Sequence, residues 1–129
     1  MNNKRILLLL MSCLILITVS AQEVMKKEKD GTYIVNTTTL AQDVEGYNGP
    51  TPLEVYIKKN KIEKVLLLKS METPKYNARI KKEMLPHYEG IKLVKGKSAE
   101  VDGLTGATFT SDAVKENVRR AIEYYWKHK

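Results

Sequence analysis

The chain has 129 residues, of which 43% are hydrophobic, and a formal net charge of +7 at pH 7. This length suffices for one hydrophobic core but not for two. The only cysteine, Cys13, lies in an apolar N-terminal stretch, so the remaining chain offers no disulfide, thiol nucleophile or cysteine metal ligand. His87 and His128 are far apart and in no ligand spacing. We therefore expect neither a metal site nor Cys-His catalysis.

The positive charge does not by itself indicate a nucleic-acid partner. Lysine and arginine outnumber aspartate and glutamate by 22 to 15, a balance that suits an acidic partner or a membrane surface. The lysines are spread along the chain, however, and aromatic residues do not alternate with them as a groove for single strands requires. We expect solvated strand edges and helix faces, and no nucleic acid.

Residues 1–21 have the pattern of a secretory signal. Lys4 and Arg5 precede an apolar run from Ile6 to Val19, and Ala21 offers a small residue at the cleavage position. The sequence thus predicts an exported protein, in the periplasm or on the outer face of the cytoplasmic membrane. A retained anchor is one alternative, although the run is shorter than the roughly 20 residues that span a bilayer. A lipoprotein acylated at Cys13 is another.

Cleavage after Ala21 leaves 129 − 21 = 108 residues, the size of one domain. Residues 22–30 are charged and aperiodic, which indicates a short tether before a domain at 31–129. Residues 33–39 alternate and are rich in β-branched side chains, as in a strand. Residues 42–52 hold two glycines and two prolines and predict a loop.

The centre of the chain predicts a hairpin and then a helix. Residues 53–58 alternate as a half-buried strand, residues 59–61 form a turn, and residues 62–69 form a more buried strand. Thr73-Pro74 is a helix start, with Thr73 as the N-cap. This helix should bury Tyr76, Ile80 and Met84 and end at Pro86.

Two short extended pieces, 91–94 and 99–101, precede a closing amphipathic helix at about 111–126. Strands followed by a helix, further short strands and a terminal helix predict an α+β domain. Its sheet should be mostly antiparallel, with a mid-chain helix and a C-terminal helix.

The segment 102–111, Asp-Gly-Leu-Thr-Gly-Ala-Thr-Phe-Thr-Ser, is the most informative part of the chain. It is a polar, glycine-containing loop that runs into the closing helix, and helix N-termini attract phosphate through free N–H groups. By itself the pattern favours a plain turn, with Gly106 at positive φ and Thr110 or Ser111 as the N-cap.

The same segment resembles the flavinylation motif Asp-x-x-Ser/Thr-Gly-Ala-Thr-x-Ser/Thr of the FMN-binding domain family. That family includes covalently flavinylated components of the sodium-translocating NADH:quinone oxidoreductase and of the Rnf complex. Every defined position of the motif is matched by this chain, at Asp102, Thr105, Gly106, Ala107, Thr108 and Thr110. The resemblance implies FMN joined through its phosphate to Thr108 by a separate flavin transferase, with FAD as donor and magnesium present.

The resemblance extends upstream, over about residues 31–126. Glu72-Thr73-Pro74 matches a loop of the family, although the family often has a glycine soon afterwards where this chain has Lys75-Tyr76. The implied flavin contacts are Glu72 and Thr73 at the ring edge and Tyr47 and Met71 against the ring. Ser111 completes the expected cofactor-binding set. Within this set, Asp102 either orients the loop or meets the metal of the transferase, unless it only caps a turn.

The resemblance implies an exported electron carrier rather than a complete enzyme, because no paired acid and base groups suggest a substrate site. The implied partners are the transferase and redox proteins, among them a membrane electron-transfer complex. Two alternatives stay open: an exported binding module without flavin, and a domain that binds FMN non-covalently.

Overall fold

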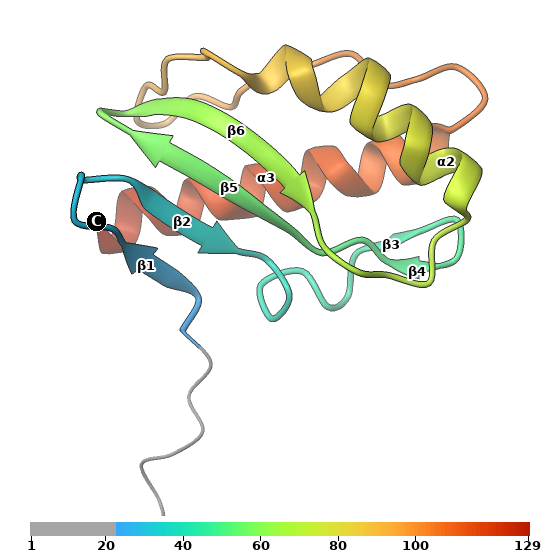
Figure 1. Ribbon diagram of the computed structural model, residues 1–129, viewed down its shortest axis with the longest axis horizontal. Coiled ribbons are helices and arrows are strands. Elements are labelled where there is room, and N and C mark those ends of the chain that lie inside the picture. The colour runs from blue at the N-terminus through green and yellow to red at the C-terminus, as the bar shows by residue number, and fades with distance from the viewer. Residues whose placement is uncertain (1–22) are drawn as a thin grey trace, which may run out of the picture.

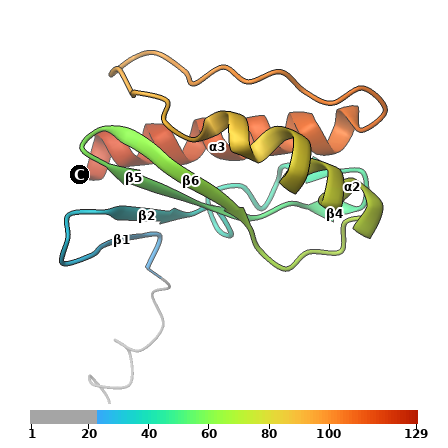
Figure 2. The ribbon, with the colours of Figure 1, turned by 45° about the horizontal axis from the view of Figure 1, so that its top comes forward.

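The computed structural model describes residues 23–129 and shows a four-stranded antiparallel sheet with helices on one side (Figures 1 and 2). The strand order is β1-β2-β5-β6. The four strands are β1 (Met25–Lys27), β2 (Tyr33–Asn36), β5 (Leu53–Lys58) and β6 (Lys61–Leu67). The expected α+β class, with a mostly antiparallel sheet, is confirmed. The signal segment 1–21 and Cys13 lie outside the described residues.

The N-terminal strand β1 was not expected. It lies within the charged stretch 22–30 and pairs with β2, Met25 opposite Val35 and Lys27 opposite Tyr33. A three-residue edge strand is too short to show an alternating pattern, so only its partner reveals it.

The central hairpin follows the sequence closely. Lys59 and Asn60 both have positive φ, 51° and 59°, as a two-residue hairpin turn requires. Side chains alternate between buried and half-buried along β5. β6 is less buried than expected, because it is an edge strand of the sheet. Val65 is buried, but Leu66 is 40% exposed.

The mid-chain helix begins at Pro74 as expected and then changes type twice. It comprises α2 (Pro74–Arg79), a π turn η1 (Ile80–Met84) and a 3-10 turn η2 (Leu85–Tyr88). Ile80 and Met84 are fully buried, whereas Tyr76 is only half-buried. Pro86 lies inside the 3-10 turn, so the prediction that it ends the helix was wrong by two residues.

The extended pieces expected at 91–94 and 99–101 are not strands. Residues 90–93 make three backbone hydrogen bonds to Asn60 and Ile62, which leave one isolated bridge between Lys92 and Lys61 and no strand. The first segment therefore lies along the start of β6 as a loop. Residues 99–101 pair with no strand in the described chain. Alternation alone could not distinguish them from strands.

The C-terminal helix α3 (Thr108–His128) lies across the sheet and closes the core (Figure 1). Its buried side includes Val114, Val118 and Tyr125, which join Val35 and Val55 of the sheet in one apolar cluster. No helix of residues 23–129 is long and apolar enough to cross a membrane. The loop expected at 42–52 contains a two-stranded hairpin, β3 (Glu45–Gly46) with β4 (Gly49–Pro50). Its first strand contacts the N-terminal end of α3.

Candidate functional site

The motif loop leads into α3 three residues earlier than expected. The helix begins at Thr108, with Ala107 in the N-cap position and no capping side chain. The expectation that Thr110 or Ser111 caps the helix was therefore wrong. Both lie inside the first turn, and their hydroxyls bind elsewhere. Thr108 is thus the first residue of the helix rather than a loop residue one turn ahead of it.

The first turn of α3 carries free hydrogen-bond donors. The first backbone bond of the helix runs from Ser111 N to Ala107 O, at 2.9 Å. Within the described chain, the amide groups of Thr108, Phe109 and Thr110 have no backbone acceptor. The Thr108 side chain is exposed. An anion at this point would meet unpaired N–H groups and the positive end of the helix dipole.

The loop is held in place from inside. Ser111 Oγ accepts a hydrogen bond from Leu104 N at 2.9 Å and donates one to Ala107 O at 2.7 Å. Gly106 has φ +82°, a conformation that glycine adopts without strain. Ala107 is buried, while the Asp102 carboxylate is exposed and makes no hydrogen bond or ion pair with residues 23–129. Ser111 therefore shapes the loop, and Asp102 caps no turn.

Arg79, at the end of α2, lies beside this loop. Its Nη1 donates a hydrogen bond to Thr105 O at 2.9 Å, and its Nε donates one to Glu83 at the same distance. A side chain added at Gly106 would place its Cβ 3.5 Å from Arg79 Nη1. The sequence did not indicate Arg79 as a site residue, because a basic side chain on an exposed helix face is usually only solvated. Only the fold brings the guanidinium to the motif.

Glu72 connects three parts of the site. The residue is only 4% exposed, and its carboxylate accepts hydrogen bonds from Tyr47 N (2.9 Å), Thr73 N (3.0 Å) and the Thr110 hydroxyl (3.0 Å). Those donors belong to the β3–β4 hairpin, the start of α2 and the first turn of α3. Both carboxylate oxygens therefore bind protein groups, and Glu72 fixes the relative positions of these segments.

Thr73 does not cap α2 with its side chain. Its hydroxyl accepts a 2.7 Å hydrogen bond from Asn48 Nδ2, while its carbonyl accepts from Tyr76 N and Asn77 N. The expected start of the helix is right, but the hydroxyl serves the hairpin contact instead. Thr73 and Glu72 thus tie the same hairpin to α2 by two independent bonds.

Exposed apolar side chains surround this cluster. Tyr47 is 59% exposed, Met71 is 84% exposed and Phe109 is 68% exposed. The Tyr47 amide itself binds Glu72, while Met71 and Phe109 are the sequence neighbours of Glu72 and Thr110. Tyr47 also makes an edge-to-face contact with Tyr76, with ring centroids 5.4 Å apart. Phe109 was missing from the expected set, because only its place in the first turn of α3 exposes it. Such a group of exposed apolar side chains is typical of a binding surface.

The aromatic residues near the C-terminus take no part in this site. Tyr125 is buried and donates its hydroxyl to Asn60 in the β5–β6 turn, at the far end of α3. Tyr124 stacks on His128. Tyr125 therefore packs the end of α3 against the sheet.

The chain matches the model of one protein family. No solved structure matches it. The matching family model is the FMN-binding domain, over residues 46–123, which is more than half of the chain. The matched range contains Tyr47, the Glu72-Thr73-Pro74 loop and the whole motif. This protein is a flavin-binding module that belongs to the FMN-binding domain family.

Proposed function

We propose that this protein is an exported electron carrier whose FMN is bound covalently, through a phosphoester, to Thr108. One observation carries the proposal: the Thr108 hydroxyl is exposed at the first position of α3, where three consecutive amides lack backbone acceptors. Those amides and the helix dipole suit a phosphate attached to this side chain.

The surroundings of Thr108 fit a phosphate group in charge as well. The Arg79 guanidinium is anchored to the loop by its bond to Thr105 O and brings a permanent positive charge beside Gly106. Asp102, the nearby acidic group of the motif, is exposed to solvent. We propose that Asp102 meets the metal of the transferase, since no contact within the described chain uses it.

The attachment step requires an outside enzyme. A threonine hydroxyl is a weak nucleophile, and no base lies within hydrogen-bond distance of Thr108 in the described residues. In the proposed step, the bond from Thr108 Oγ1 to phosphorus forms as the pyrophosphate bond of FAD breaks. AMP leaves, and the hydroxyl proton passes to a base of the flavin transferase.

Bound FMN supplies electron transfer, and the chain supplies burial, orientation and hydrogen bonds. We propose that Tyr47, Met71 and Phe109 contact the isoalloxazine ring, since they are the exposed apolar side chains around the Glu72 contact. Glu72 and Thr73 position the segments that carry them. The partners would be redox proteins outside the cytoplasm or in the membrane, as the expected signal segment 1–21 suggests.

Mass spectrometry after co-expression with a flavin transferase tests the proposal. We expect the processed chain to gain the mass of FMN less one water, and fragmentation to place that mass on Thr108. Thr108→Ala should abolish the added mass. Thr110→Ala is the matched control, because it removes a neighbouring hydroxyl that is buried and bonded to Glu72. It should keep the flavin.

The outcomes separate the alternatives. Flavin that comes off on denaturation would indicate non-covalent binding. An unmodified chain beside an active transferase would rule out the covalent link. Loss of flavin from both variants, with native circular dichroism, would point to another acceptor.

A further inference from the structure

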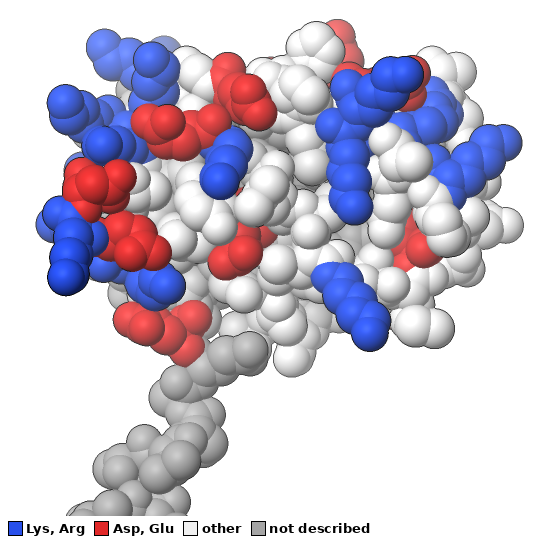
Figure 3. Space-filling model, in the orientation of Figure 1, with Lys and Arg blue, Asp and Glu red and all other residues white. Residues whose placement is uncertain are grey.

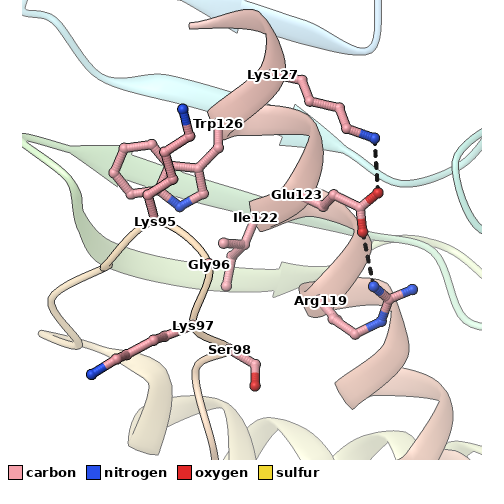
Figure 4. A pocket seen from close by; sticks show the side chains of 9 residues that line it. All are labelled: Lys95, Gly96, Lys97, Ser98, Arg119, Ile122, Glu123, Trp126 and Lys127. Atoms are coloured by element: carbon pink, nitrogen blue, oxygen red, sulfur yellow. Dashed lines mark hydrogen bonds and ion pairs between the residues drawn. The ribbon is translucent and has the colours of Figure 1, made fainter.

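A hollow lies at the opposite end of α3 from Thr108. It has a volume of about 630 Å³ and is formed between residues 95–98 and the last turns of α3 (Figure 4). Its lining includes Lys95, Lys97, Ile122 and Trp126. Eighteen residues separate Thr108 from Trp126, which is about 27 Å along the helix axis. The hollow is therefore separate from the flavin motif.

Basic residues outnumber acidic ones around the hollow. Four of its lining residues are basic and one is acidic: Lys95, Lys97, Arg119, Lys127 and Glu123. Glu123 binds Arg119 at 2.9 Å and Lys127 at 3.0 Å, so its charge is already shared between two cations (Figure 4). Lys95 and Lys97 form no ion pair within residues 23–129. The Lys95 side chain lies beside Trp126, whereas the Lys97 side chain points away from α3, so the two positive charges flank the loop rather than meet at one point (Figure 4).

The helix side of the hollow is apolar and holds one unsatisfied donor. Ile122 and Trp126 point from α3 towards residues 95–98 (Figure 4). The indole ring is held by an edge-to-face contact with Tyr125, with centroids 5.2 Å apart, and by Lys129 Nζ at 4.8 Å. Its Nε1 is buried and has no hydrogen-bond partner in the described chain. Buried indole N–H groups usually have an acceptor.

We propose that this hollow binds an anionic amphiphile, with its acidic group at Lys95 and its apolar body against Ile122 and Trp126, while Lys97 adds a second positive charge at the rim. The volume lies within the range of about 300–1,000 Å³ of small-molecule sites, and such sites combine apolar walls with a few polar groups. The acidic group can belong to a free small molecule or to a membrane lipid, since the site recognises the same chemistry in both. This site is independent of the flavin.

Trp126 makes the proposal directly measurable, because it is the only tryptophan of the chain. Anilinonaphthalene sulfonate is an anionic, aromatic probe of suitable size. Titration of the flavin-free protein should quench Trp126 emission to saturation, with one probe bound per chain. N-phenylnaphthylamine is the matched neutral probe, since it lacks only the sulfonate. It should bind at least about tenfold more weakly, and added salt should weaken the sulfonate alone.

Two double variants identify the site. Lys95→Ala with Lys97→Ala should lower the affinity for the sulfonate probe about tenfold or more. Lys81→Ala with Lys82→Ala removes the same charge from exposed lysines of η1 and should change the affinity less than about twofold. The proposal is overturned if quenching does not saturate, if both probes bind equally, or if the two double variants behave alike.

Vesicles then distinguish the two sources of the ligand. If the source is a lipid, the protein should co-sediment with phosphatidylglycerol vesicles but not with phosphatidylcholine vesicles, and Lys95→Ala with Lys97→Ala should reduce the bound fraction. If the soluble probe binds and the vesicles do not, the source is a free amphiphile. Because no flavin is needed, failure here is separate from failure of the proposed function.

Discussion

The Thr110 hydroxyl donates a 3.0 Å hydrogen bond to Glu72 Oε2 across 38 positions of sequence. The same oxygen accepts the Tyr47 amide at 2.9 Å. One buried carboxylate oxygen therefore joins the first turn of the motif helix to the β3–β4 hairpin. The exposed Thr108 hydroxyl lies two residues before this contact, and its loop is held separately by the hydrogen bonds of Ser111.

Glu72→Gln should destabilise the protein by about 1–3 kcal/mol. The variant keeps the size of the side chain but replaces one acceptor oxygen by an NH2 group. This group faces donors of Tyr47, Thr73 and Thr110, so at least one buried hydrogen bond is lost. Urea unfolding followed by circular dichroism measures the change. Glu89→Gln, at an exposed position, is the control and should be neutral. Equal midpoints for the two variants would show that Glu72 contributes nothing to stability.

Gly46→Ala should also destabilise the fold, by roughly 1–3 kcal/mol. A Cβ at Gly46 would lie 2.3 Å from Glu72 Oε2 and 3.0 Å from Thr51 Cγ2, so the carboxylate must move away from Thr110. Gly90→Ala tests glycine substitution away from the site, since open space surrounds Gly90. Its φ of +86° still adds strain. Gly46→Ala and Glu72→Gln disturb the same contact. In the double variant, the loss of unfolding free energy should therefore be smaller than the sum of the two single losses. Full additivity would contradict the predicted clash.

Arg79→Gln should slow attachment of flavin by the transferase, by about three- to tenfold. It removes the positive charge beside Gly106 and the bond to Thr105 O that holds the loop. The time course of in-gel flavin fluorescence measures the rate. Lys82→Gln removes a charge from an exposed position of η1 and should not alter it. An unchanged rate of attachment in Arg79→Gln would show that Arg79 has no role in flavin attachment.

Glu116→Gln should lower stability at neutral pH but not in acid. Two hydrogen bonds from Arg119 and one from Arg120 lower the pKa of Glu116 from 4.5 to about 2. The stabilisation is complete above pH 4.5 and is lost as the pH falls towards 2. One third of the side chain is exposed, so we expect only about 0.5–1 kcal/mol. Thermal unfolding at pH 7 and pH 2 should show a difference that disappears in acid. A constant difference would exclude this ion pair as its cause.

The surface charge shows how far prediction from the sequence extends. In the sequence the lysines are spread along the chain, and we expected solvated edges and faces. In the structure Lys95 and Lys97 lie opposite the last turns of α3, and lysines and arginines group towards two sides of the face in Figure 3. Loops have no period from which such an arrangement could be predicted.

The sequence by itself determined the central hairpin, the start of the mid-chain helix, the C-terminal helix and the motif with Thr108. These features depend on local physics: alternation, a two-residue turn, proline at a helix start and a glycine loop before a helix. Only the tertiary structure decided that β1 pairs with β2, that α3 begins at Thr108, and that Arg79 and Glu72 meet the motif. The physical reason is that such contacts join residues far apart in sequence, and their energy exists only once the sheet and α3 have packed together.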